Sequence, residues 1–317
     1  MLSPDTEELS ADELRQGWRE AHVQPLWEIP QAHPGAAREL APVAWPWRSM
    51  EPLIRRAIAL TSPEGAERRV LSLIDPTGRD GDFHTIANLN AGLQVLLPGE
   101  VARPHRHSMD ALRFVLTGEG AVTRVDGLEA PMATGDLVLT PGWWWHEHWH
   151  AGTEPIVWLD VLNVHAHIQM GTLAFEPGPV HDVPDHPADT MLRYRFADAK
   201  RMLDDMAPGA DGMRRFRYRD PRTGGPVLPL LDCYLVRLEP GRSTRAIRTS
   251  AHAVCAVVEG RGTTTTGGGA IAWGRRDVFT LPSGASIVHH ADETSYLFMC
   301  TDGEILGRLG LLTEEIL

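Results

Sequence analysis

Short apolar runs separated by glycine dominate the chain from about residue 68 onward. They include RVLSLID (69–75), GLQVLLPGE (92–100), ALRFVLTGEGAVTRVDG (111–127), DLVLTPG (136–142) and EPIVWLDVLNV (154–164). Regularly spaced short strands of this kind are typical of a sandwich or a barrel. A second region with the same texture begins near Leu228. The pattern therefore predicts an all-β-dominated fold.

Helical patterns flank and separate the two β regions. Ser10 and Glu13 form a capping-box pattern that opens a helix running to about His22. Ser49 is expected to cap a second helix, and a third helix is expected around residues 197–206. The segment between the first two helices is rich in proline, which enforces an extended arm that packs on its own domain or on a neighbouring subunit. These prolines are Pro25, Pro30, Pro34, Pro42 and Pro46.

The two β regions align with each other as copies of one design. Residues 103–120 lie over 245–262 without a gap, and 135–148 lie over 276–289. Under this alignment His105 falls on Ile247, His107 on Thr249, Arg113 on Cys255 and His146 on Ile287. The second copy keeps the strand pattern and loses the polar residues that point inward in the first.

Composition narrows the class of protein. A chain of 317 residues that is 43% hydrophobic and 23% charged is expected to form about two globular domains. The net charge of −12 argues against nucleic acid or an anionic membrane as the main partner. Neither a long apolar run nor a charged leader is present, so the cytoplasm is the expected location. Cys233, Cys255 and Cys300 are widely spaced and are expected to be buried apolar residues.

The densest chemistry lies in the first β region. Alternate residues of a strand share a face, so His105, His107 and Arg113 are expected to point the same way, as are His146 and His148. An H-x-H pair with a third histidine about 40 residues later can supply three facial nitrogens to a divalent metal. The alternative is that these histidines are surface or satisfied core residues. The spacing and the ligand-free second copy favour a metal site.

Other polar residues of this region allow more than one interpretation. Arg113 is either a clamp for a substrate carboxylate or a structural arginine that pairs with a buried carboxylate. Asp160 interrupts an apolar strand, so it needs a partner, which is Arg113, His148 or a substrate hydroxyl. Gln94 is a pocket residue or an ordinary hydrogen-bonding residue of the barrel wall. His165 and His167 follow a strand end and are expected at the surface.

The motifs resemble those of the cupin superfamily. G-x5-H-x-H is present at Gly99, His105 and His107, and G-x5-P-x4-H at Gly135, Pro141 and His146. The glutamate usual in cupins is absent, since residues 111–113 read Ala-Leu-Arg. A three-histidine set with ALRFV and PGWWWHEH resembles gentisate 1,2-dioxygenases and their salicylate and 1-hydroxy-2-naphthoate dioxygenase relatives. These are bicupins that hold iron(II) in the N-terminal barrel and assemble as tetramers.

The resemblance implies a role for each site residue and a domain plan. Metal binding falls to His105, His107 and His146, and catalysis to His148, Asp160 and Arg113. Substrate binding is assigned to Arg113, Gln94, Asn90, Gly92, Trp145 and one of Arg68 or Arg69, with Arg69 taken as the pocket residue. The plan is a helical and extended arm (1–66), a metal-binding cupin barrel (67–175), a linker with a helix (176–220) and a degenerate cupin barrel (221–317).

The expected activity follows from these roles. We expect an Fe(II)-dependent dioxygenase that inserts both atoms of O₂ between the carboxyl-bearing and hydroxyl-bearing carbons of an ortho-hydroxy aromatic carboxylate such as gentisate or salicylate. One alternative is a 1-hydroxy-2-naphthoate dioxygenase. Others are a zinc- or manganese-dependent isomerase or hydrolase, and a non-catalytic cupin that binds aromatic acids.

Overall fold

The computed structural model describes residues 10–26, 41–61, 68–76, 84–181 and 183–317. The chain divides into two compact units, residues 1–38 and residues 39–317. Pro30 and Pro34 of the expected extended arm lie outside the described residues, as does the expected boundary at residue 66.

The first unit contains one described helix, α1 (Ala11–Glu20). Its N-terminus carries the capping box that the sequence predicts, because the Glu13 backbone N–H donates to Ser10 Oγ while the Ser10 backbone N–H donates to Glu13 Oε2. These bonds satisfy two of the backbone N–H groups that a helix leaves unpaired at its start.

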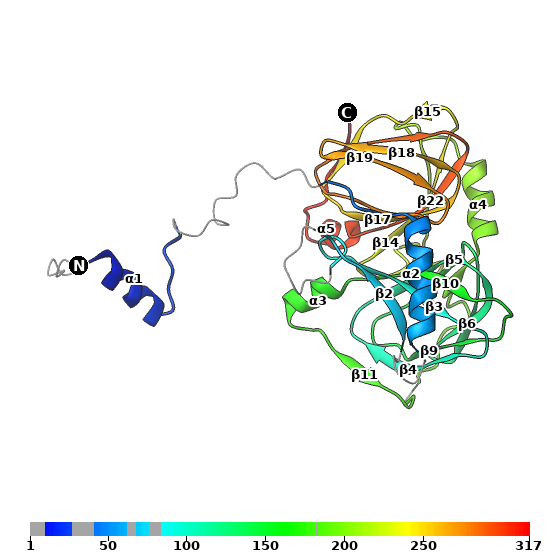
Figure 1. Cartoon of the computed structure of the whole chain (residues 1–317), viewed down its shortest axis with the longest axis horizontal. Coiled ribbons are helices and arrows are strands. Elements are labelled where there is room, and N and C mark those ends of the chain that lie inside the picture. Colours follow the sequence, from blue (N-terminus) through cyan, green and yellow to red (C-terminus); the bar gives the residue numbers. More distant parts are fainter. Residues whose placement is uncertain (1–9, 27–40, 62–67, 77–83, 182) are drawn as a thin grey trace. The chain divides into compact units, whose positions relative to one another are not determined.

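The second unit contains two β-barrels, which lie one above the other in Figure 1. The first barrel, cyan to green, has one sheet in the order β12-β8-β5-β10-β3-β2 and another in the order β11-β4-β9-β6-β7. Its strands are β2 (Arg69–Leu73), β3 (Asn90–Leu96), β4 (Val101–His107), β5 (Ala111–Thr117), β6 (Glu119–Val125), β7 (Leu128–Ala133), β8 (Leu137–Thr140), β9 (His146–His150), β10 (Ile156–Leu162), β11 (Phe175–Pro177) and β12 (Arg193–Tyr194).

The second barrel repeats this plan. One sheet has the order β1-β20-β17-β22-β14-β13, and the other has the order β19-β18-β21-β16-β23 with β15 also on β21. Its strands are β1 (Ala44–Trp45), β13 (Arg214–Arg217), β14 (Asp232–Leu238), β15 (Arg242–Ser243), β16 (Ile247–Thr249), β17 (Ala253–Glu259), β18 (Arg261–Thr266), β19 (Gly269–Gly274), β20 (Val278–Leu281), β21 (Ser286–Ala291), β22 (Ser295–Thr301) and β23 (Glu314–Ile316).

Strand pairing confirms the duplication. His105 of β4 is in register with His146 of β9, and at the aligned positions Ile247 of β16 is in register with Ile287 of β21. Equivalent strand pairs therefore occur in both barrels, and only the side chains on them differ. The expected domain boundaries stay a prediction.

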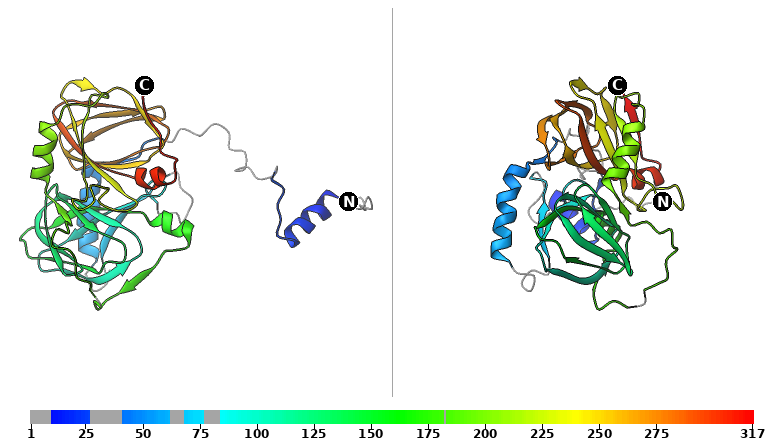
Figure 2. Two further views of the ribbon diagram at one scale, coloured as in Figure 1. Left: turned by 180° about the vertical axis from the view of Figure 1, so that it is seen from behind. Right: turned by 90° about the vertical axis from the view of Figure 1, so that its right-hand side faces the viewer.

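Four helices accompany the barrels in the part of the chain that the structure describes, and one of them begins differently from the prediction. They are α2 (Trp47–Leu60), α3 (Val164–Met170), α4 (Phe196–Asp205) and α5 (Gly303–Arg308). Ser49 does not cap α2 but lies inside its first turn, because the backbone N–H of Trp47 donates to Asp277 Oδ1 at 2.7 Å. A cap supplied from 230 residues away leaves no local signal in the sequence. The predicted helix near 197–206 is confirmed as α4, which runs along the second barrel in both views of Figure 2.

A large buried cluster joins the two barrels. Phe114 of β5 stacks on Phe298 of β22 with ring centroids 4.2 Å apart, and Leu112 and Val254 belong to the same cluster. Because neighbouring residues of a strand point to opposite faces, a Phe114 that packs between the barrels directs Arg113 into the first barrel. The inter-barrel core therefore helps to orient the polar interior.

Two further expectations are met in the described part of the chain. Cys233, Cys255 and Cys300 are free and buried, as their spacing predicted. No described helix combines the length and the apolar character needed to cross a membrane.

Candidate metal centre and substrate pocket

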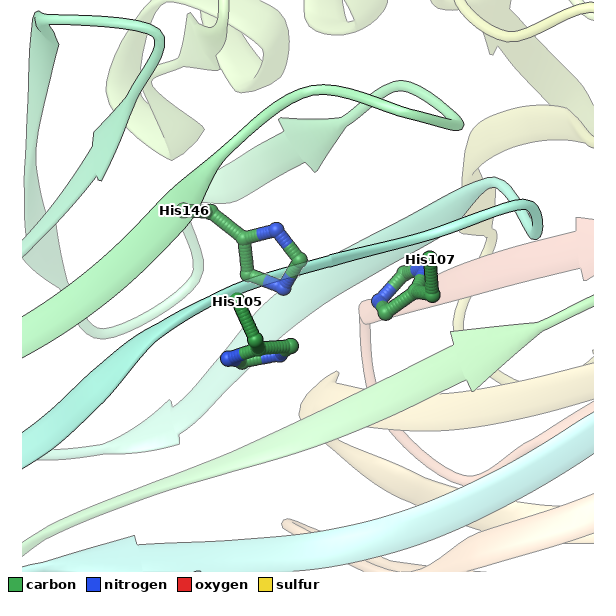
Figure 3. Close-up of side chains that lie close together, drawn as sticks. All are labelled: His105, His107 and His146. Atoms are coloured by element: carbon green, nitrogen blue, oxygen red, sulfur yellow. The ribbon is translucent and has the colours of Figure 1, made fainter. Parts of the chain in front are cut away.

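Three buried histidines converge inside the first barrel. His105 and His107 come from β4 and His146 from β9, and their nitrogens lie within 4.8 Å of one another. The ring of His146 is 4.1 Å from that of His105 and 4.8 Å from that of His107, measured between centroids. Figure 3 shows the three imidazoles pointing toward a common region. Such a set can donate three nitrogens to one face of a divalent metal.

The backbone fixes which nitrogen of each ring is free to bind a metal. The Nδ1 atoms of His105, His107 and His146 lie 3.0, 2.9 and 3.0 Å from the carbonyl oxygens of Arg103, Met109 and Trp144 respectively. A carbonyl only accepts, so each Nδ1 carries the proton and each Nε2 keeps its lone pair. The Nε2 of His146 is buried without a hydrogen-bond partner in the described part of the chain. A metal ion fits this donor set.

Burial keeps these ligands neutral. Desolvation, helped by the charge of Arg68, lowers the pKa of His105 to about 3. Desolvation likewise lowers the pKa of His107 to about 4 and that of His146 well below its usual range. Neutral imidazoles are the form that coordinates a metal, so the ligands need not lose a proton at neutral pH.

Arg68 contacts one of the candidate metal ligands and also lines the pocket beside them. Its Nη1 donates to His105 Nε2 at 2.8 Å, and its guanidinium lies over the Phe175 ring at 5.6 Å. A metal bound at His105 Nε2 would compete with this hydrogen bond. Because Arg68 also lines the adjoining cavity, its guanidinium can turn toward an anionic ligand there.

A cavity of about 210 Å³ adjoins His107. It exceeds the roughly 150 Å³ cavity that is known to hold a benzene ring in a protein core. Strands β2, β3, β4, β5 and β10 all contribute to its wall. The polar residues and the glycine among its lining are Arg68, Ser72, Asn90, Gly92, Gln94, His107, Arg113 and Asp160. The cavity is therefore ring-sized and carries a cationic side.

The charge at the centre of this wall belongs to Arg113 and Asp160. The two residues are in register on β5 and β10, and Arg113 Nε lies 3.6 Å from Asp160 Oδ1. Arg113 Nη1 also donates to Thr140, while Asp160 accepts from Trp158 Nε1 at 3.0 Å. Desolvation raises the pKa of Asp160 to about 6, although Arg113 opposes the shift. Arg113 Nε faces Asp160 beyond hydrogen-bond distance and makes no hydrogen bond to the described residues.

His148 lies one strand pleat beyond His146, and its ring is fully buried. Its Nδ1 is 2.9 Å from Thr123 Oγ1, and Thr123 itself donates to Met132 Sδ at 3.2 Å. A hydroxyl has one proton, so His148 Nδ1–H donates to Thr123 and His148 Nε2 keeps a lone pair. That Nε2 has no partner among the described residues. His148 is thus a neutral base held in one orientation.

Comparison with known proteins places this site in a family. Residues 92–162 match the cupin domain model. The chain is 33% identical to a 5-aminosalicylate 1,2-dioxygenase of Comamonas (99% of this chain, 92% of the relative) and 33% identical to a gentisate 1,2-dioxygenase of Ralstonia (96% and 93%). A crystal structure of salicylate 1,2-dioxygenase from Pseudoaminobacter salicylatoxidans with gentisate matches with a TM-score of 0.88 at 30% identity, covering 100% of this chain and 96% of that one.

The chain belongs to the gentisate and salicylate 1,2-dioxygenase family of cupins. It is a ring-cleaving dioxygenase with a site for a metal cofactor. The fold predicted from the sequence, two cupin barrels, is confirmed.

Two residues assigned to the pocket of this dioxygenase lie elsewhere. Arg69 forms an ion pair with Glu100 and donates to Thr61 at 3.0 Å, so Arg68 is the arginine that lines the cavity. Trp145 packs beneath Arg106, whose guanidinium lies 4.7 Å from the ring. The reason is strand parity in both cases, since the neighbour of an inward residue points outward.

Some residues near the site escaped the sequence analysis. Thr123 and Thr140 hold His148 and Arg113, and only the pairing of distant strands brings them together. His165, expected at the surface, is half-buried on α3 and lies 3.0 Å from Asn90 Oδ1. The asparagine that lines the cavity is therefore held by a helix that the sequence pattern did not reveal.

A buried histidine in the second barrel of the dioxygenase, away from the metal centre, allows a test of how stability depends on pH. Desolvation lowers the pKa of buried His289 to about 4, against about 6.5 in an unfolded chain. Its contribution to stability is present above pH 6.5 and is lost as the pH falls toward 4, because only the unfolded state takes up the proton. Between pH 7 and 5 we expect the wild type to lose about 2 kcal/mol more than His289→Gln in denaturant unfolding. Equal losses in the two proteins would contradict this.

Proposed function

We propose that this dioxygenase uses iron(II) to cleave an ortho-hydroxy aromatic carboxylate of the gentisate or salicylate class. The convergence of three neutral Nε2 atoms beside a ring-sized cavity that contains Arg113 carries the proposal. Relatives named for gentisate, salicylate and 5-aminosalicylate support the substrate class. His105, His107 and His146 would hold the metal, and three neutral ligands would leave its full charge for an anionic substrate.

Bound iron(II) would supply open positions for substrate and O₂ and the electrons that activate O₂. The chain's own residues do the rest. Arg113 and Arg68 bind the carboxylate and orient the ring. His148 Nε2 accepts the phenolic proton of the substrate, and Thr123 holds that imidazole in place. Asp160 keeps the Arg113 guanidinium directed into the cavity, while Gln94, Asn90 and Gly92 form the wall against which ring substituents rest.

The reaction needs no reductant. The bond between the carboxyl-bearing and hydroxyl-bearing ring carbons breaks, and both atoms of O₂ enter the product. The test is to load the full chain with iron(II) anaerobically, then to follow O₂ uptake and ultraviolet spectra with gentisate, salicylate, substituted salicylates and 1-hydroxy-2-naphthoate. We expect one O₂ consumed per substrate molecule with at least one of these acids. Tight binding of the acids without O₂ uptake would contradict the proposal.

A matched pair of variants tests the role of Thr123. Thr123→Val keeps the shape of the side chain and removes the hydrogen bond that orients His148, so we expect kcat to fall on the order of tenfold while the metal is retained. Thr264→Val removes the equivalent bond in the second barrel and is the control, because it lies outside the metal-binding barrel. Equal kcat values in the two variants would show that Thr123 has no role in catalysis.

Assembly as a homotetramer and a cytoplasmic location remain predictions from the resemblance and the composition. Sedimentation of the purified chain would test the first, and a monomer at micromolar concentration would contradict it.

A further inference from the structure

The second barrel also contains a cavity, of about 120 Å³. Most of its wall is apolar, with Ile247, Cys255, Ile287 and Met299 among the lining residues. Apolar cavities near 150 Å³ stay dry and accept a benzene-sized molecule. At about 120 Å³ this cavity is somewhat smaller, so a single small ring is the largest occupant expected.

This cavity is the counterpart of the substrate pocket. In the first barrel Arg113 of β5 pairs across the strands with Asp160 of β10, and in the second Cys255 of β17 pairs with Met299 of β22. Both pairs line their cavities. The second barrel has thus kept the space of the pocket while replacing its ion pair, and two of its three metal ligands, with apolar residues.

One polar pair of the first barrel interior survives the change. His289 occupies the position of His148, and its Nδ1 lies 2.7 Å from Oγ1 of Thr264, just as His148 lies beside Thr123. The third member differs, because Trp273 Nε1–H donates to Thr264 Oγ1 at 2.9 Å where the first barrel has Met132 as an acceptor.

Because of that difference, the imidazole carries its proton on the other ring nitrogen. Thr264 Oγ1 accepts from Trp273, and among the described residues its own proton has no acceptor other than His289 Nδ1, so the Thr264 hydroxyl donates to Nδ1 and the ring proton sits on Nε2. His289 lines the cavity, and its Nε2 bonds to none of the described residues. Desolvation keeps this ring neutral near pH 7 by lowering its pKa to about 4. His289 therefore presents a hydrogen-bond donor at Nε2, where His148 of the first barrel presents a base.

The charged side chains near the cavity disfavour an anionic ligand. Arg215 pairs with Asp211 and, at 3.1 Å, with Glu314, and Arg217 pairs with Glu304 and, at 2.8 Å, with Asp232. Of these residues Arg215, Asp232 and Glu314 line the cavity, so one guanidinium there faces two carboxylates, and the position of Arg113 holds an uncharged thiol. A carboxylate in this cavity would meet Asp232 and Glu314 beside an arginine that is already ion-paired, which disfavours its entry.

We propose that the second barrel is a binding site for a neutral single-ring aromatic molecule whose oxygen accepts a hydrogen bond from His289 Nε2. A phenol is neutral and has this acceptor, whereas the acids proposed as substrates are anions. The site is separate from the metal centre and needs no metal.

The probes for this site are 4-fluorophenol, fluorobenzene and 4-fluorobenzoate, with binding to the full chain measured by ¹⁹F NMR. Ala253→Leu fills the cavity, and Ala111→Leu fills the aligned position of the first barrel as its control. We expect 4-fluorophenol to bind the wild type and Ala111→Leu, and to lose that site in Ala253→Leu. Thr249→Leu is the second filling variant if Ala253→Leu does not fold, as judged by thermal unfolding.

His289→Leu separates the hydrogen bond from the cavity. Loss of the hydrogen bond should weaken the binding of 4-fluorophenol roughly threefold to tenfold and leave the affinity for fluorobenzene unchanged. Three results would overturn the proposal: unchanged 4-fluorophenol affinity in both filling variants, equal affinity in His289→Leu, or binding of 4-fluorobenzoate that Ala253→Leu removes.

Discussion

Replacing His146 with alanine is expected to abolish metal retention and ring cleavage together. His146 supplies one of three converging nitrogens, its Nε2 has no other partner among the described residues, and two ligands on one strand cannot close a facial site. Loss of metal removes stabilisation worth about 4 kcal/mol or more, which corresponds to a rate loss on the order of 1,000-fold or greater. The measurements are metal content by mass spectrometry and O₂ uptake with the preferred substrate.

The control for this variant is Ile287→Ala. Ile287 is the aligned residue of the second barrel, in register with Ile247 as His146 is with His105. This variant shortens a buried side chain on the same type of strand pair, so it reports the cost of the substitution to the fold without touching the ligands. If His146→Ala kept full metal and turnover, the ligand assignment would be wrong.

Arg113→Ala is expected to retain the metal and to lose substrate binding and orientation. The residue is 3% exposed, and its removal leaves the buried Asp160 without its cation. Truncating one member of such a pair costs about 2–5 kcal/mol, so kcat/KM should fall roughly 30-fold to several thousand-fold. Steady-state kinetics and metal analysis of the same preparation check both parts.

A double variant separates the two roles of Arg113. Arg113→Met with Asp160→Asn removes both charges, so the fold should recover relative to Arg113→Ala, as measured by thermal unfolding. Substrate binding should stay weak, because no cation remains at that wall position. Recovery of kcat/KM in the double variant would show that Arg113 matters only as a partner of Asp160.

The three candidate ligands could be predicted from the sequence because their signal is local. H-x-H sets two rings on one face of a strand, and the aligned second copy shows what the same strands look like without a metal site. Arg113 and Asp160 also follow from strand parity within apolar runs. Parity alone could equally have excluded Trp145, which directly precedes inward-facing His146.

The features that sequence reasoning missed depend on contacts between distant segments. Thr123 meets His148 only because β6 pairs with β9, and no local pattern distinguishes this threonine from any other in a strand. The start of α2 depends on Asp277, and Asn90 is held by His165 on an unexpected helix. Each case is a tertiary contact that overrides or adds to local propensity.

The stacked rings of Phe114 and Phe298 bear on why the ligand-free half of the molecule has been retained. Arg113 adjoins Phe114 on the same strand, so the opposite face of the strand that carries Arg113 is apolar. A gene fragment encoding only the metal-binding barrel would expose that apolar face to water. Such a fragment should aggregate or require a solubilising partner. Once the two barrels shared this apolar interface, one of them could lose its metal site in evolution, but neither barrel could be lost.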